Sequence, residues 1–205
     1  MMRALRFIPG IVLFASVLCA QTQQGMIYSF YTGFSKPGTP SDFQKNWRSG
    51  YSLGAGLGRT VTPRLQTHLN FDYSNYALDD RNYMQSQDLV SAETVIEGGT
   101  ISIATLYLDL KYLYPTPAVK NVTPYLVAGA GLFYLHNEEM RVYSGIEDVI
   151  HEASNEAALG AGLGIGFNIY VEGVTSLFVE VRFNLGLTET ETTVILPIKL
   201  GFSIH

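Results

Sequence analysis

Apolar and small residues alternate strictly along residues 157–169, and this stretch sets the pattern for the rest of the chain. Its odd positions from Leu159 to Ile169 are apolar, whereas glycine occupies the even positions from Gly160 to Gly166. A period of two indicates a β-strand with one apolar face and one nearly bare face. Glycine weakens a strand unless another group must approach closely, so this pattern is typical of a barrel with lipid outside and a narrow lumen. The tetrapeptide GAGL recurs at residues 54–57 and 129–132.

Similar alternation elsewhere in the chain predicts eight strands in total. They are expected at residues 26–33, 49–59, 64–76, 100–114, 124–137, 156–168, 177–187 and 192–204. Connections after the second, fourth and sixth strands are short, whereas three others are long and polar: residues 34–48, 77–99 and 138–153. Outer-membrane barrels place short turns in the periplasm and long loops outside. The chain is therefore predicted to be all-β, an eight-stranded antiparallel up-and-down transmembrane β-barrel with both ends in the periplasm.

The N-terminus has the features of a secretory signal peptide at residues 1–20. Arg3 and Arg6 precede an apolar run, and the small residue at position 20 suits cleavage before Gln21. Residues 21–205 are then the outer-membrane β-barrel domain. Cys19, the only cysteine of the chain, would leave with the signal peptide. The alternative, in which Cys19 is lipidated, stays open.

Two observations exclude nucleic-acid and dinucleotide binding. The chain has a formal net charge of −5 and no cluster of Lys or Arg, which makes it a poor partner for nucleic acid. The glycine-rich stretches also fail the dinucleotide fingerprint, because Ile165 and Arg59 stand where its third glycine is required. We expect no metal and no cofactor, since the acidic loops lack a fixed spacing of oxygen ligands.

Charged residues and one histidine fall on the predicted inner face of the strands. They carry both signs in similar number, and buried charges must be paired. An eight-stranded barrel leaves room inside only for side chains or one small ligand, so we expect a plug of ion pairs. The alternative is a permeation path or gate. The predicted lumen charge network is Arg64, His68, Asp72, Asp109, Lys111, Glu180, Arg182 and Lys199.

Glycines occupy much of the same inner face on three of the strands. They leave two interpretations open: a cavity on one side of the lumen, or a space filled by Tyr107, Tyr125, Phe133 and Arg182. The predicted lumen glycines are Gly54, Gly56, Gly129, Gly131, Gly160, Gly162 and Gly164.

Several short motifs, taken in order, resemble the outer-membrane β-barrel domain family of OmpA/OmpX type. They are Trp47-x-x-Gly50-Tyr51-x-x-Gly54-x-Gly56, Thr62-Pro63-Arg64, Pro124-Tyr125 followed by Gly129-x-Gly131, and Leu196-Pro197-Ile198-Lys199-Leu200-Gly201-Phe202. The resemblance implies a monomer in the cell outer membrane, in contact with membrane lipid and lipopolysaccharide. It also implies insertion by the barrel-assembly machinery, with Phe202 as the C-terminal assembly signal, although three residues follow it.

These features favour a structural or surface-interaction role through the extracellular loops, with a largely plugged lumen and no enzymatic activity. A narrow porin-like channel for small solutes is the alternative. A lipid A-modifying enzyme is a third possibility, because His136 and Glu138 share a face near the outer end of a strand. That chemistry needs a nucleophile beside them, and no serine is clearly placed there.

Overall fold

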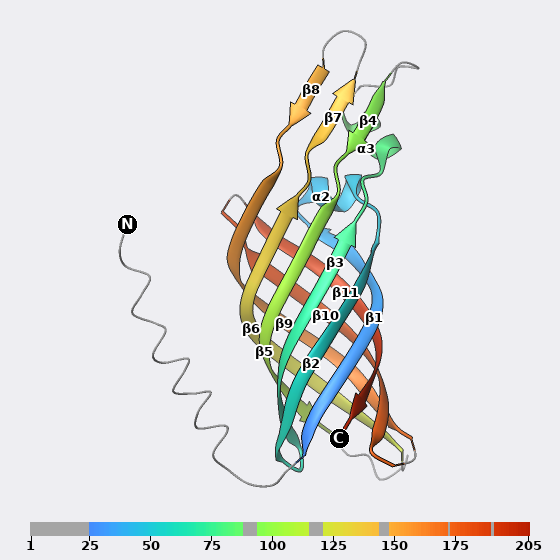
Figure 1. Ribbon diagram of the computed structural model, residues 1–205, viewed down its shortest axis with the longest axis vertical. Coiled ribbons are helices and arrows are strands. Elements are labelled where there is room, and N and C mark those ends of the chain that lie inside the picture. The colour runs from blue at the N-terminus through green and yellow to red at the C-terminus, as the bar shows by residue number, and fades with distance from the viewer. Residues whose placement is uncertain (1–24, 88–93, 115–120, 144–147, 172, 190) are drawn as a thin grey trace, which may run out of the picture.

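The computed structural model describes residues 25–87, 94–114, 121–143, 148–171, 173–189 and 191–205, and shows a closed antiparallel barrel (Figure 1). The order around the barrel is β1-β11-β10-β9-β6-β5-β3-β2. The predicted fold class, an eight-stranded up-and-down barrel, is confirmed. The signal peptide and Cys19 lie outside the described residues. The barrel strands are β1 (Met26–Thr39), β2 (Gly50–Thr62), β3 (Leu65–Tyr76), β5 (Ile101–Leu113), β6 (Val122–Asn137), β9 (Ser154–Tyr170), β10 (Thr175–Leu187) and β11 (Thr192–Ile204).

Alternation along each strand separates an apolar outer surface from a packed interior. On β10, Leu177, Val179 and Val181 point outward and are 38–44 % exposed, whereas Glu180 and Arg182 between them are buried. The same alternation places exposed Leu, Val, Ile and Phe around the outside of the barrel. A soluble protein would leave such a surface in water, but a membrane-spanning barrel presents it to acyl chains.

The pairing of β11 with its two neighbouring strands is irregular at two places, one beside Pro197 and one beside Pro37. Pro197 keeps its register with Ser35 of β1, but the pairing of β10 with β11 skips the positions opposite Pro197 and Leu196. Proline has no backbone N–H to donate, so this gap in the ladder is the expected consequence. The register of β1 against β11 shifts only further up, between Pro37 and Thr39.

The end of the barrel opposite the C-terminus and the start of β1 carries additional structure (Figure 1). Helix α2 (Ser41–Asn46) lies in the β1–β2 connection, and α3 (Asp80–Ser86) follows β3. Strands β4 (Val95–Gly98), β7 (Met140–Tyr143) and β8 (Asp148–His151) form a separate antiparallel sheet in the order β4-β7-β8. Among the described residues, no helix is both long and apolar enough to span a membrane.

The three long connections were therefore predicted wrongly as plain polar loops. β1 continues to Thr39, six residues beyond its predicted end, and the other two connections contribute α3, β4, β7 and β8. Gly98 and Gly99 both have φ near +80°, a conformation that glycine adopts without steric cost, and they join β4 to β5. Four-residue strands are too short to give a periodic signal, which is why the sequence pattern missed them.

Candidate functional site

A two-point ion pair between Arg182 and Asp109 lies at the centre of the lumen. Arg182 Nη1 donates to Asp109 Oδ2 at 2.7 Å, and Nη2 contacts the other carboxylate oxygen. Both side chains are completely inaccessible to solvent. Asn70 Nδ2 donates to the same Asp109 Oδ2 at 2.5 Å. The planar guanidinium matches the two oxygens of a carboxylate, so this pair combines charge compensation with a fixed geometry.

A second set of ion pairs extends from Arg182 toward β11 and β3. Lys199 Nζ lies 2.6 Å from Asp72 Oδ1 and 3.6 Å from Glu180 Oε1. Glu180 Oε1 is also 3.8 Å from Arg182 Nη1, and Tyr125 Oη donates to Glu180 Oε2 at 3.0 Å. Each ion therefore lies close to an opposite charge, as the cost of burying it requires.

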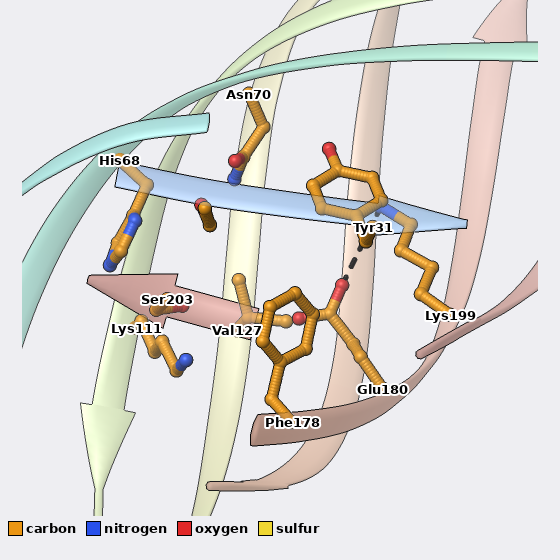
Figure 2. Close-up of a pocket in the computed structure, with 10 residues that line it drawn as sticks. Tyr31, His68, Asn70, Lys111, Val127, Phe178, Glu180, Lys199 and Ser203 are labelled. Atoms are coloured by element: carbon orange, nitrogen blue, oxygen red, sulfur yellow. Dashed lines mark ion pairs between the residues drawn. The ribbon is translucent and has the colours of Figure 1, made fainter. Parts of the chain in front are cut away.

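Lys111 and His68 lie nearer the end that carries the C-terminus. Lys111 Nζ donates to Asn168 Oδ1 at 3.0 Å and sits 3.7 Å from the centre of the Tyr125 ring. His68 Nε2 is 3.2 Å from Gln66 Oε1. Figure 2 shows His68 and Lys111 on one side of a small cavity, with Glu180 and Lys199 on the other. The volume of this cavity is about 30 Å³. That volume is on the scale of a few water molecules at most.

Glycines on the inner face make room for large side chains from other positions. A Cβ atom added at Gly166 would fall 2.5 Å from the Tyr125 ring, and one at Gly186 would fall 2.5 Å from Phe133 Cγ. At Gly162 it would lie 2.7 Å from Arg182 Nε. These distances favour the interpretation in which large side chains fill the space beside the glycines. The other predicted lumen glycines closely approach backbone or inward side chains: Gly54, Gly56, Gly129, Gly131, Gly160 and Gly164.

An apolar cluster lies at the end of the lumen away from the C-terminus. Phe43 of α2 is 4 % exposed and packs edge-on against Tyr76, with 5.1 Å between ring centres. Tyr76 Oη is in turn within 2.5 Å of Ser35 Oγ. The helix thus covers the barrel mouth with a buried aromatic side chain. The remaining buried members of the cluster are Ile101, Ile103, Phe133 and Ile195.

Seven of the eight residues predicted for the charge network line the lumen, and Arg64 does not. Arg64 is exposed in the turn between β2 and β3, so its assignment to the lumen was wrong. Thr62 Oγ1 accepts hydrogen bonds from the backbone N–H groups of Arg64 and Leu65, at 3.3 and 3.1 Å. This turn contact delays the start of β3 to Leu65 and removes Arg64 from the alternation.

Two other predicted positions lie outside the lumen. Phe202 points outward on β11, 41 % exposed, with its ring centre 5.6 Å from that of Phe30. Its role as an assembly signal stays a prediction. His136 Nδ1 lies 2.7 Å from Asn155 Oδ1, which also accepts a hydrogen bond from Tyr134 Oη at 2.9 Å. Glu138 lies beyond the end of β6.

The neutral partners of the network were not identified from the sequence. Asn70, Asn168 and Tyr31 share the inward phase of their strands with the charged residues, so the alternation contained a signal for them. Tyr31 lies under Lys199, with Nζ 4.6 Å from its ring centre. No periodic signal pointed to Phe43, because α2 is a single short helix inside a connection.

Comparison with known proteins agrees with this architecture. A family model described as the outer membrane protein beta-barrel domain matches residues 19–191. The chain belongs to this family. The protein is therefore an outer-membrane β-barrel, and the predicted location in the outer membrane is confirmed.

Solved outer-membrane barrels share the fold at low sequence identity. Neisserial surface protein A is 17 % identical with a TM-score of 0.56, over 90 % of this chain and 99 % of that one. OprG from Pseudomonas aeruginosa is 12 % identical with a TM-score of 0.51, over 90 % of this chain and 98 % of that one. No curated protein sequence matches significantly. At these identities the likeness shows the fold alone.

Proposed function

We propose that this barrel is a non-conducting membrane anchor that presents a folded extracellular platform to other molecules. The observation that supports the closed lumen is the presence of two successive barriers. Phe43 and its apolar cluster fill the mouth, and the Arg182–Asp109 pair with its neighbours fills the middle. A solute would have to displace both to pass, and breaking a buried pair exposes an uncompensated charge.

The platform consists of α2, α3 and the β4-β7-β8 sheet. Its own core contains Leu78, Tyr83, Met140 and Val142, each at most 8 % exposed. Trp47 packs against this core and also against the cluster at the barrel mouth. The sheet is therefore joined to the barrel by continuous packing, and a rigid surface loses less conformational entropy on binding than free loops do.

The remaining roles of the surface follow from the same architecture. The outward apolar rows would contact outer-membrane lipid, and the platform would lie among the sugars of lipopolysaccharide. We further propose insertion by the barrel-assembly machinery and a monomeric state, since the barrel closes its own sheet edges without a second chain.

A narrow channel is the competing function. The small cavity between His68, Lys111 and Lys199 is the feature that favours it, since it lies in the polar half of the lumen. A cavity of about 30 Å³ holds water and is too small for a sugar or an amino acid. Conduction would require α2 and the central ion pairs to move together.

Vesicle swelling tests the proposal. The mature chain, refolded in lipid vesicles, is challenged with glycine and with arabinose, and insertion is checked by heat-modifiable migration on a gel. We expect no swelling beyond that of protein-free vesicles. The control replaces residues 41–46 with a Gly-Ser linker and carries Asp109→Ala and Arg182→Ala, which removes both barriers. Swelling by the unaltered protein, comparable to that of the control, would overturn the closed lumen.

A further inference from the structure

A second cavity, of about 230 Å³, lies at the junction of the barrel rim with the extracellular sheet. Its wall is formed by Trp47 after α2, by the ends of β5 and β6, and by the segment that joins β8 to β9 (Figure 1). The polar side chains on this wall include Asn137, Glu138, His151, Glu152 and Ser154. Glu138 and Glu152 are exposed, so the cavity is open to a ligand from outside the cell.

The hydrogen-bond donors on this wall are largely engaged. Trp47 Nε1 donates to Gly99 O at 2.8 Å, so its indole offers the cavity only ring surface. Asn137 Nδ2 donates to Ser154 Oγ at 3.0 Å, while Asn137 Oδ1 is buried without a hydrogen-bond partner. His151 Nε2 is shared with Tyr83 Oη at 3.3 Å.

Two other groups on the wall, the carboxylates of Glu138 and Glu152, are acceptors that carry negative charge. Ionised Glu138 and Glu152 accept hydrogen bonds but donate none. None of the described residues that line the cavity is a lysine or an arginine. Nearby Arg141 is held by Glu139, with Nε 2.6 Å from Oε1. The charge of the wall therefore favours a ligand that brings a positive charge and hydrogen-bond donors for the two carboxylates.

We propose that this cavity binds a small organic cation, a primary amine or a diamine. Its ammonium group would donate to the Glu138 and Glu152 carboxylates, and its methylene chain would lie along the Trp47 ring, which also attracts a cation electrostatically. A bare metal ion is a poorer fit. The described residues contain no group of three or more His, Cys, Asp and Glu side chains positioned to hold one.

The exposure of the two carboxylates sets the strength of the interaction. Ion pairs in contact with water contribute about 0.2–1 kcal/mol each, which corresponds to a change in affinity of about fivefold at most. Binding should therefore be weak and should weaken further with added salt. This inference rests on the proposed function, because it assigns a ligand to the extracellular platform.

Trp47 is the only tryptophan of the chain, so its fluorescence reports on the cavity directly. We would titrate the refolded mature chain in detergent micelles with putrescine, a four-carbon diamine, and measure the heat of binding on the same sample. A saturable change in Trp47 emission with a matching heat signal is expected. The neutral analogue 1,4-butanediol and Mg²⁺ should produce neither. An equal response to butanediol or to Mg²⁺, or no heat with putrescine, would overturn the proposal.

Three variants separate this cavity from general surface charge. Glu138→Gln and Glu152→Gln should each weaken putrescine binding, by about fivefold at most. Asp148→Asn, on β8 but outside the cavity wall, should leave binding unchanged while removing the same single negative charge. Equal weakening by all three variants would reduce the effect to non-specific attraction and contradict the site.

The outcome is independent of the test for the closed lumen. Swelling of vesicles by the unaltered protein would overturn the non-conducting barrel but leave the cavity intact. If the protein causes no vesicle swelling and also shows no response to putrescine, only the amine site is overturned.

Discussion

Arg182 and Asp109 form a two-point ion pair across the lumen, although their strands, β10 and β5, are separated around the barrel by β9 and β6. Lys199 of β11 and Asp72 of β3 form a second pair between strands that are not neighbours. These contacts connect opposite parts of the barrel wall through its interior. They add to the backbone ladder, which joins only neighbouring strands.

Each single replacement in the central pair should destabilise the barrel, and the two costs should not add. Asp109→Asn or Arg182→Met alone leaves an uncompensated buried charge, with an expected cost of about 3–5 kcal/mol. The double variant should cost less than the sum of the single variants, by about 0.5–3 kcal/mol, because the two side chains are in contact. Urea titration in lipid vesicles, followed by Trp47 fluorescence, measures this difference. Strictly additive costs would show that the pair is not coupled.

The fit of glycine against aromatic side chains gives a second prediction. Gly166→Val places a side chain where the Tyr125 ring and the Val179 carbonyl already lie, so we expect a loss of about 1–3 kcal/mol or failure to fold. The matched control is Ile165→Val on the adjacent outward position, 57 % exposed, which should change stability by less than about 0.5 kcal/mol. Equal effects at the two positions would contradict the packing of glycine against aromatic rings.

Because the outer surface of the barrel is apolar, the loss of stability caused by an added charge should depend strongly on where the charge is placed. Leu108 lies near the middle of β5 and is 49 % exposed. Leu108→Arg should lower the free energy of unfolding by about 2–4 kcal/mol, because it would place a charge in the bilayer core. Ile150→Arg on β8 is the control. It is 57 % exposed outside the barrel and should alter the free energy of unfolding by less than about 0.5 kcal/mol. Similar costs for both would place Leu108 outside the membrane.

Asp79 at the start of α3 makes the platform sensitive to acid. A hydrogen bond from Arg48 Nε, 3.1 Å away, holds the pKa of the Asp79 carboxyl below its usual range, and the backbone N–H of Asn82 acts in the same direction. The folded-state pKa is lower than that of the unfolded chain. These contacts therefore stabilise α3 above the usual pKa of about 4 and are lost as the pH falls through the folded-state value.

Amide chemical shifts in α3 test this pH dependence. In micelles, the Asn82 and Tyr83 signals should move with a midpoint below about pH 4. Asp79→Asn should abolish this titration, and Asp80→Asn, one residue along, should preserve it. A midpoint at or above the usual carboxyl pKa would contradict the contact with Arg48.

The barrel was predictable from the sequence because inward and outward side chains alternate with a period of two along every strand. Each strand must present one face to lipid and one to the lumen, so alternation alone located the strands and their inward residues. The prediction that Arg64 lines the lumen was wrong, because a local hydrogen bond from its backbone N–H to Thr62 Oγ1 places it in a turn. Such contacts depend on turn geometry, which periodicity does not encode.

The packing of side chains inside the lumen was only partly predictable. The alternation along the strands predicted that Asp109 and Arg182 point inward. Their pairing could not be predicted, because it depends on the shear of the barrel, which determines which distant strands face each other. Phe43 and the β4-β7-β8 sheet were missed because they are held by long-range packing onto Tyr76, Tyr83 and Trp47. Segments of four to six residues have too few positions to show a period.

Single-channel recording in a planar bilayer tests the closed lumen most directly. Residues 21–205, with insertion verified by heat-modifiable migration, should give no discrete openings. A variant without α2 and with Asp109→Ala and Arg182→Ala should give openings under the same conditions. Steady, reproducible openings from the unaltered protein would contradict the account and make transport its leading function.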